Sequence, residues 1–257
     1  MIFTQKKHDF LANYQIFRAA YFLQHYHNIR PMLTMKDVVQ IALTKDEIIT
    51  CLEKTKQNHF IDNLRHRHPN VQFDCKLRGY VGELAMKKWF EQNGIELEKT
   101  NYLENDGNID IDFLVKGKNI ELKTSLIPNK YGNLETVIKK CDIKLIKRGI
   151  ANIEQLQGDV HLQIYYTQKR EDKDRWLKNQ RINFSASNEE LYAAFRADCF
   201  LHSTSFVAWI DKPALIQKIN SLPTDQRTWS YAQRDFWNCK LYQSKKPMEL
   251  INYLESV

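Results

Sequence analysis

The sequence predicts an α/β fold, on the evidence of two strand patterns and one helical pattern in the middle of the chain. Apolar residues alternate with mostly polar ones over residues 109–115 and again over residues 158–168, which is the period of a strand with two different faces. Over residues 77–95 apolar side chains recur at helical spacing, and Gly94 follows as a stop signal. Together these elements predict a sheet with a helix packed on it.

The first strand is expected to turn back through residues 116–119, with Gly117 supplying a positive φ. If Gly117 and the residue after it form a two-residue loop, then Asp112 lies opposite Lys123. A slip of one residue would move every side chain to the other face, so the register is part of the prediction. The polar residues that share one face are then Asp110, Asp112, Glu121 and Lys123.

Such a polar face indicates a metal site. Neighbouring carboxylates repel each other and raise each other's pKa, so their burial together requires a cation. Hard oxygen ligands suit Mg²⁺, or Mn²⁺ in its place. A lysine beside them can orient a water molecule or neutralise charge on a phosphate. The alternative is an exposed hairpin with a solvated polar face and a cross-strand ion pair between Asp112 and Lys123.

The helix upstream offers one more acid, Glu83, among its apolar positions. One interpretation is an ordinary surface glutamate near the start of a helix, where the helix dipole favours negative charge. The other is a fourth acidic group that reaches the metal site from the helix packed on the sheet.

These residues together resemble a known family. The pattern G-x-x-G-E on a helix (Gly79, Gly82, Glu83), an aspartate on a strand (Asp112) and E-x-K on the next strand (Glu121, Lys123) is similar to the PD-(D/E)XK nuclease superfamily. The resemblance covers residues 77–167, about a third of the chain. It implies a restriction-endonuclease-like fold, with a mixed central sheet flanked by helices, and metal-dependent cleavage of DNA.

The resemblance also implies a role for each residue. Glu83 matches the helix acid, Asp112 the metal-binding aspartate, Glu121 the second metal ligand and Lys123 the lysine that assists the attacking water. All four are therefore candidate catalytic residues, and the three acids are candidate ligands of Mg²⁺, for which Mn²⁺ substitutes. No proline precedes Asp112, and Asp110 competes with it, so the pattern leaves open which aspartate binds the metal.

By this resemblance the chain is expected to be a deoxyribonuclease, and its size is similar to that of a type II restriction enzyme that cuts double-stranded DNA at a short sequence. Such enzymes work as homodimers and accompany a methyltransferase. A repair, recombination or phage-defence nuclease of the same superfamily is one alternative. A basic DNA-binding module without catalysis is another, and an RNA substrate also stays open.

The charge of the chain agrees with a polyanionic partner. Its 257 residues carry a net charge of +7, which favours binding to phosphates. Five basic residues gather directly after the hairpin: Lys139, Lys140, Lys144, Lys147 and Arg148. The segment fits either a helix or an extended chain, and its cations fit either a phosphate clamp or a solvated face.

The remaining segments define the expected organisation. Residues 1–75 are expected to form a helical region, and residues 76–257 the catalytic α/β domain with a C-terminal extension. Capping boxes at 44–47 and 187–190 predict helix starts. Further along, residues 206–210 predict a buried strand, residues 211–222 a helix, and the chain closes on a helix after Pro247.

Four aromatic residues near the end, Trp229, Tyr231, Phe236 and Trp237, fit either a core or a surface on which bases stack. The paired histidines at positions 25, 27, 66 and 68 lack the spacing of metal ligands. Five scattered cysteines predict free thiols. The sequence has no signal-peptide pattern and no membrane span, so a cytoplasmic location is expected.

Overall fold

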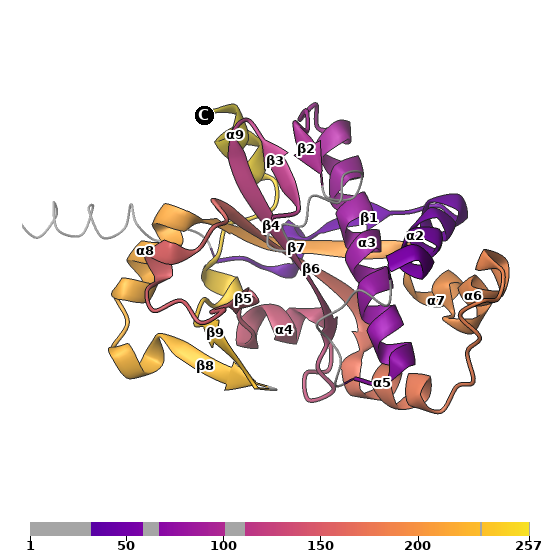
Figure 1. The fold of residues 1–257 in the computed structure, drawn as a ribbon. Helices are drawn as coiled ribbons and strands as arrows, with labels where there is room; N and C mark the ends of the chain where they lie inside the picture. The colour runs from indigo at the N-terminus through magenta and orange to yellow at the C-terminus, as the bar shows by residue number, and fades with distance from the viewer. Residues whose placement is uncertain (1–31, 59–66, 101–110, 232, 257) are drawn as a thin grey trace, which may run out of the picture. The chain divides into compact units, whose positions relative to one another are not determined.

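A mixed sheet runs through the computed structural model, which describes residues 32–58, 67–100, 111–231 and 233–256. The strand order is β1-β7-β6-β4-β3-β2, in the unit of the chain that begins at Leu33 (Figure 1). The strands are β1 (Val39–Ala42), β2 (Lys99–Thr100), β3 (Phe113–Val115), β4 (Lys118–Ile127), β6 (Val160–Lys169) and β7 (Ser203–Asp211). β4 and β6 are parallel, and the other neighbouring pairs are antiparallel. The predicted α/β class is confirmed.

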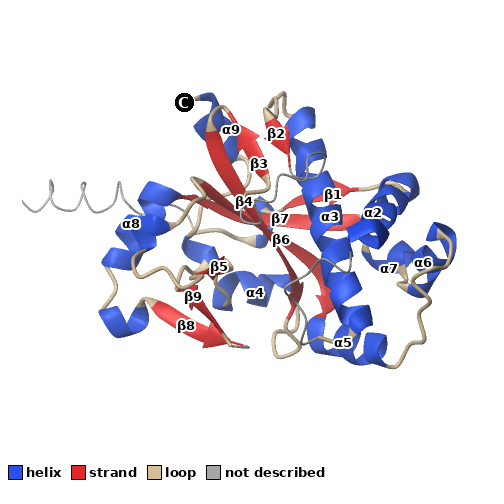
Figure 2. Cartoon of the chain, viewed as in Figure 1, coloured by secondary structure: helices blue, strands red, loops and turns tan. Residues whose placement is uncertain are grey.

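Helices cover both faces of this sheet (Figure 2). The α-helices are α2 (Lys45–Asn58), α3 (Pro69–Gln92), α4 (Leu134–Lys140), α5 (Arg170–Lys178), α6 (Asn188–Ala194), α7 (Ala197–Phe200), α8 (Lys212–Asn220) and α9 (Glu249–Glu255). Four short 3₁₀ turns join them: η1 (Met35–Asp37), η2 (Ile153–Gln155), η3 (Thr224–Gln226) and η4 (Leu241–Gln243). No helix in the described ranges is long and apolar enough to cross a membrane.

A second, smaller sheet has the order β5-β9-β8. Its strands are β5 (Leu145–Ile146), β8 (Thr228–Tyr231) and β9 (Arg234–Trp237). The basic segment after the hairpin therefore divides: its first part ends α4 at Lys140, and its second part is extended and enters this sheet. Both of the conformations that the sequence allowed are present, one after the other.

Helix α3 is the long helix predicted from residues 77–95, and it starts earlier than predicted. His68 caps it by accepting a hydrogen bond from the backbone of Asn70, and Pro69 occupies the first turn, where its missing N–H has no cost. At the other end Gly94 adopts φ +70°, as its position after the last turn predicts.

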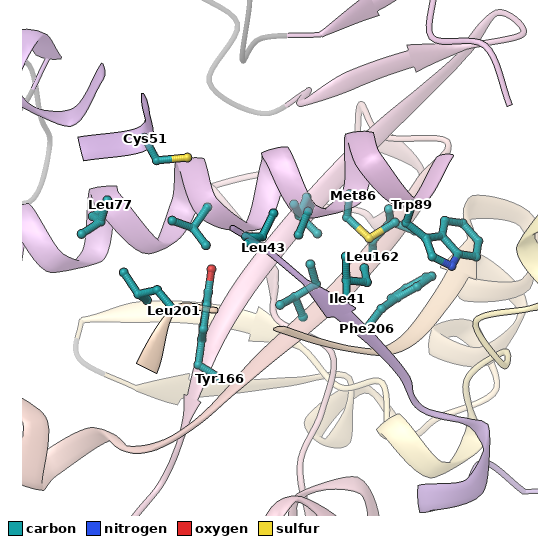
Figure 3. Close-up of a cluster of buried hydrophobic side chains, with 14 of the residues drawn as sticks. Ile41, Leu43, Cys51, Leu77, Met86, Trp89, Leu162, Tyr166, Leu201 and Phe206 are labelled. Carbon is teal, nitrogen blue, oxygen red and sulfur yellow. The ribbon is translucent and has the colours of Figure 1, made fainter. Parts of the chain in front are cut away.

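Two hydrophobic clusters lie on the two faces of the main sheet. One packs α2 and α3 against the strands, and in Figure 3 Met86 and Trp89 point from α3 toward Phe206 of β7. The ring centroids of Trp89 and Phe206 are 5.3 Å apart in an edge-on contact. The other cluster packs α4, α8 and the second sheet against the opposite face. The main sheet is therefore the middle layer of three, which fixes α3 over β4.

The expected helical region at residues 1–75 needs correction. Residues 39–42 form β1, which pairs with β7 and so belongs to the main sheet. The expected boundary at residue 75 falls inside α3. Short strands at a sheet edge are set by their partner, and that partner is more than 160 residues away here, so the local pattern did not reveal it. Residues 1–31 lie outside the described residues.

Other local predictions are confirmed. The capping box at Thr44 and Glu47 starts α2, and the one at Ser187 and Glu190 starts α6. The strand predicted at 206–210 is the centre of β7, and the helix that follows it is α8. The last helix after Pro247 is α9. All five cysteines are free.

Candidate active site

The hairpin that carries the candidate ligands is formed by β3 and β4. Its two-residue loop is Lys116 and Gly117, with φ angles of +47° and +68°, so the turn lies one residue earlier than predicted. Leu114 pairs with Asn119. The same register sets Asp112 opposite Glu121, and the predicted pairing of Asp112 with Lys123 is wrong by two residues. Because the shift is even, every side chain keeps its predicted face.

Asp112 directly precedes β3, at the point where the pairing of β3 with β4 ends. Its N–H donates to the carbonyl of Ile120 at 2.9 Å, and its Oδ2 accepts from the N–H of Leu122 at 2.6 Å. From Leu122 on, the edge of β4 that faces away from β6 has no strand partner among the described residues. The carboxylate of Asp112 thus lies at the beginning of an open strand edge. Asp110, the competing aspartate, lies outside the described residues.

Glu121 is buried on β4 and surrounded by basic groups. Its Oε1 lies 2.6 Å from Lys123 Nζ and 3.7 Å from Arg148 Nη2, and its Oε2 lies 2.8 Å from His161 Nδ1 on β6. Burial opposes ionisation, but the charge of Lys123 and the hydrogen bond with His161 outweigh it and lower the pKa of Glu121 to about 2. Glu121 is therefore ionised at neutral pH.

Glu83 reaches the same region from α3. Gly82 allows this approach, since a Cβ there would lie 2.5 Å from Cγ2 of Thr124 on β4. The Oε2 of Glu83 is buried and accepts no hydrogen bond from the described residues. Burial, and next the negative charge of Asp112, raise the pKa of Glu83 to about 8. The interpretation of Glu83 as a surface glutamate is therefore wrong.

The donor atoms fit a divalent cation. Glu83 and Asp112 supply hard oxygen ligands, and the unpaired oxygen of Glu83 beside a second acid is stabilised by a cation. Within the described ranges no three His, Cys, Asp or Glu side chains are grouped closely enough to form a metal centre as they stand. Glu121 is held instead by its contacts with Lys123 at 2.6 Å and His161 at 2.8 Å.

A cleft of about 730 Å³ begins at Lys123 and continues along the open edge of β4. Its walls come from the first half of α3, the start of α5, the loop before α4 and the second sheet. The basic residues that line it are Arg67, Arg78, Lys123, Lys130, Lys140, Lys144, Arg170, Lys178, Arg234 and Lys240, and the acidic ones are Asp142 and Asp174. The cleft is therefore strongly basic.

Lys144 shows the effect of this concentration of charge. Burial, and next the neighbouring charges of Arg170 and Arg78, lower the pKa of Lys144 to about 8. The backbone N–H of Lys144 donates to Gln163 Oε1 at 3.0 Å, and Gln163 in turn donates to the carbonyl of Lys123. Gln163 thus connects the basic wall to the strand that carries the candidate site.

The five predicted nucleic-acid-binding residues have different surroundings. Lys140 and Lys144 line the cleft. Lys139 pairs with Glu135 at 2.6 Å on the exposed side of α4, and Lys147 lies over the ring of Trp237 at 5.5 Å. Arg148 approaches Glu121 at 3.7 Å and so lies beside the candidate site.

Sequence reasoning missed His161 as a partner of Glu121 and missed the basic residues of α3 and α5. His161 stands on the predicted polar face of β6, but only the parallel register, in which Glu121 pairs with His161, brings the two together. Arg78 lies on the helix that was predicted, and its exposure to the cleft depends on how α3 crosses the sheet. A sequence pattern specifies neither the register of β4 with β6 nor the way in which α3 crosses the sheet.

Comparisons of the chain with protein-family models, with curated proteins and with solved structures find no match. Function is therefore inferred from the site itself.

Proposed function

We propose that the chain is a Mg²⁺-dependent nuclease that hydrolyses phosphodiester bonds in DNA, with a restriction-endonuclease-like fold. One observation carries the proposal: Glu83 lies near enough to Asp112 and Lys123 for their charges to shift its pKa, and Lys123, which contacts Glu121 at 2.6 Å, lines the start of the basic cleft. Carboxylates that can hold a cation, next to a basic cleft, are what metal-dependent cleavage of a polyanion requires.

The residues have distinct roles in this proposal. Asp112 and Glu83 would hold the ion, together with Glu121 once its contact with Lys123 opens. A bound ion polarises the scissile phosphate and lowers the pKa of a coordinated water. Lys123, released from Glu121, donates to the attacking water or to the phosphate, and so stabilises the charge that develops there. His161 holds Glu121 in place through its 2.8 Å contact.

In this proposal the surrounding cations supply the affinity for the DNA phosphates. Arg148 lies near enough to Glu121 to neutralise a phosphate at the site, and Lys140 and Lys144 line the path away from it. Sequence-specific cutting as a type II restriction enzyme adds three expectations: a homodimer, a cognate methyltransferase and a cytoplasmic location. A repair or phage-defence role uses the same active site and differs in the products.

The test is a plasmid digestion in Mg²⁺, in Mn²⁺ and in EDTA. Glu121→Ala and Lys123→Ala should each lower the cleavage rate by at least about a hundredfold, since each removes charge from the reacting centre. The matched controls are Glu91→Ala and Lys87→Ala, an exposed glutamate–lysine pair on α3, which should cut as the wild type does. Discrete bands indicate a restriction enzyme, whereas nicks or smears indicate a repair or defence nuclease. Cleavage in EDTA, or full activity in both site variants, would contradict the proposal.

A further inference from the structure

The second sheet turns one face toward the basic cleft. In the β8–β9 hairpin Trp229 pairs with Phe236, and Tyr231 pairs with Arg234. Direct cross-strand partners, and residues two apart on one strand, share a face of a sheet. These four side chains therefore form one surface, and all four line the cleft. The alternation of the hairpin thus places its aromatic residues and an arginine on the cleft side.

The opposite face of the same hairpin differs in character. There Ser230 donates to Asp235 at 2.5 Å, and neither residue lines the cleft. The same face carries Trp237, which pairs with Thr228 and packs in the hydrophobic cluster on that side of the main sheet. The hairpin is thus anchored to the core through one face, and its other face is turned to the cleft, as in sheets that bind a ligand on one face.

The aromatic face has a fixed base and an exposed end. Trp229 and Phe236 stack on each other, with ring centroids 4.6 Å apart and an angle of 17° between the ring planes. Phe236 is buried, whereas Tyr231, at the end of β8, leaves 51% of its surface exposed. An exposed tyrosine ring next to a basic cleft is the kind of surface on which nucleic-acid bases stack.

At the end of the β8–β9 hairpin, Tyr231 and Arg170 meet across the cleft. The guanidinium of Arg170, at the start of α5, lies 4.9 Å from the centre of the Tyr231 ring. The hairpin, which extends toward the side where α5 begins, thus contacts the opposite wall (Figure 1). A volume of about 730 Å³ is in the range of roughly 300–1,000 Å³ found for pockets that bind small molecules. Such a space is large enough for a few nucleotides of one strand.

The charges on the other walls complete the arrangement. Ten of the described Lys and Arg residues line the cleft, against two Asp. Arg78 on α3 and Lys178 on α5 belong to walls outside the second sheet, so phosphates and bases of one strand would meet different sides of the cleft. The cleft also contains Lys123, so a strand bound here leads to the candidate active site.

We infer that the cleft binds an unpaired DNA strand, with its bases stacked on Tyr231 and Trp229 and its phosphates held by the cations of the opposite walls. This inference rests on the proposed function, because it takes the bound strand to be the one that the nuclease cuts. The substrate is then DNA with a single-stranded portion.

The test measures binding of the full chain, in EDTA so that nothing is cut, to a fluorescent DNA strand of about 12 nucleotides, a length typical of single-strand sites. The same sequence as a blunt duplex and as RNA gives two further arms. The strand should bind at least about tenfold more tightly than the duplex. Tyr231→Ala should weaken strand binding by about tenfold, the effect expected for one stacked base, and Tyr231→Phe should retain it. The control is Ser230→Ala, on the other face of the same hairpin.

Equal or tighter binding of the duplex would overturn the inference, and so would unchanged strand binding in Tyr231→Ala. Tighter binding of the RNA strand would overturn the assignment to DNA. Strand binding that depends on Tyr231, in a protein that cuts no plasmid and no tailed duplex, would contradict the proposed nuclease function and still support the inference. Metal-dependent cleavage that Tyr231→Ala leaves unchanged, together with unchanged strand binding, would support the nuclease and reject the stacking surface.

Discussion

Two of the acids on helix α3, Asp74 and Glu83, have sharply different surroundings. Asp74 is completely buried and lies 2.8 Å from both Arg78 Nε and Lys173 Nζ. Burial opposes its ionisation, but these two cations prevail and lower the pKa of Asp74. Glu83 has a buried oxygen without a partner in the described chain, faces the charge of Asp112, and has its pKa raised to about 8.

The difference distinguishes an acid that stabilises the fold from one that does not. A buried carboxylate that only stabilises is paired, because an unpaired one costs several kcal/mol of stability. At Glu83 the buried Oε2 accepts no hydrogen bond from the described residues, and the charges of Lys54 and Lys123 do not offset burial and the charge of Asp112. Strongly shifted pKa values of this kind gather at functional sites. The comparison therefore indicates a structural role for Asp74 and favours the proposed role of Glu83 as a metal ligand.

The largest expected effect is on the structural acid. Asp74→Asn leaves two buried cations without a counter-charge and should lower the free energy of unfolding by about 3–5 kcal/mol. Because the pKa of Asp74 is lower in the folded chain, its stabilisation is complete above the unfolded value of 3.8 and is lost as the pH falls below it. Urea unfolding at pH 7 and pH 3 measures both effects. If Asp74→Asn lowers the free energy of unfolding by less than about 1 kcal/mol, then Asp74 contributes no more than a surface ion pair does, and its contrast with Glu83 disappears.

The opposite sign is expected at Glu83. Its raised pKa means that the folded chain holds the proton more tightly than the unfolded chain, so stability falls as the pH rises from 4.5 to about 8. Glu83→Gln should abolish this dependence and raise the free energy of unfolding at pH 8 by about 1–3 kcal/mol, while cleavage is lost. Urea unfolding at pH 5 and pH 8, without metal, gives the comparison. Destabilisation by Glu83→Gln at pH 8 would show that the acid stabilises the fold after all.

A smaller effect should come from the two glycines that precede Glu83. Gly82→Ala places a Cβ against Thr124 and should cost about 1–3 kcal/mol through overpacking, and it should displace Glu83 and slow cleavage. Gly79 has no atom within 4 Å of such a Cβ, so Gly79→Ala should be neutral or stabilise by up to about 1 kcal/mol. Thermal unfolding and the plasmid assay on both variants measure this. Equal behaviour of the two variants would mean that close packing at Gly82 does not position Glu83.

The sequence predicted the elements better than their mutual placement. Alternation and capping found β4, β6 and α6, because these signals are local. The faces of Asp112 and Glu121 were correct even though the hairpin register was wrong by two residues, since an even shift preserves faces. The turn itself could not be placed, because both Lys116–Gly117 and the pair one residue later put Gly117 at a position that tolerates positive φ.

Long-range pairing is what the sequence could not supply. His161 lies beside Glu121 only through the parallel pairing of β4 with β6, which are joined by a connection with its own helix. The pairing of β1 with β7 and the meeting of Tyr231 with Arg170 depend likewise on residues far apart in the chain. The residues of the candidate site were thus predictable from local spacing, whereas the cleft beside them was not.

The most direct test of the central claim is a calorimetric titration of the full chain with Mn²⁺, with Glu83→Gln and Asp112→Asn beside the wild type and Glu135→Gln as a control on the exposed side of α4. If the two acids hold the ion, the wild type and the control bind Mn²⁺ alike. Each site variant should then bind Mn²⁺ at least about 10- to 100-fold more weakly than the wild type. Loss of a residue that only hydrogen-bonds a metal ligand has an effect of this size, and loss of a ligand itself should have no smaller one. Mn²⁺ binding of equal strength in all four proteins, or no binding to the wild type, would contradict the account.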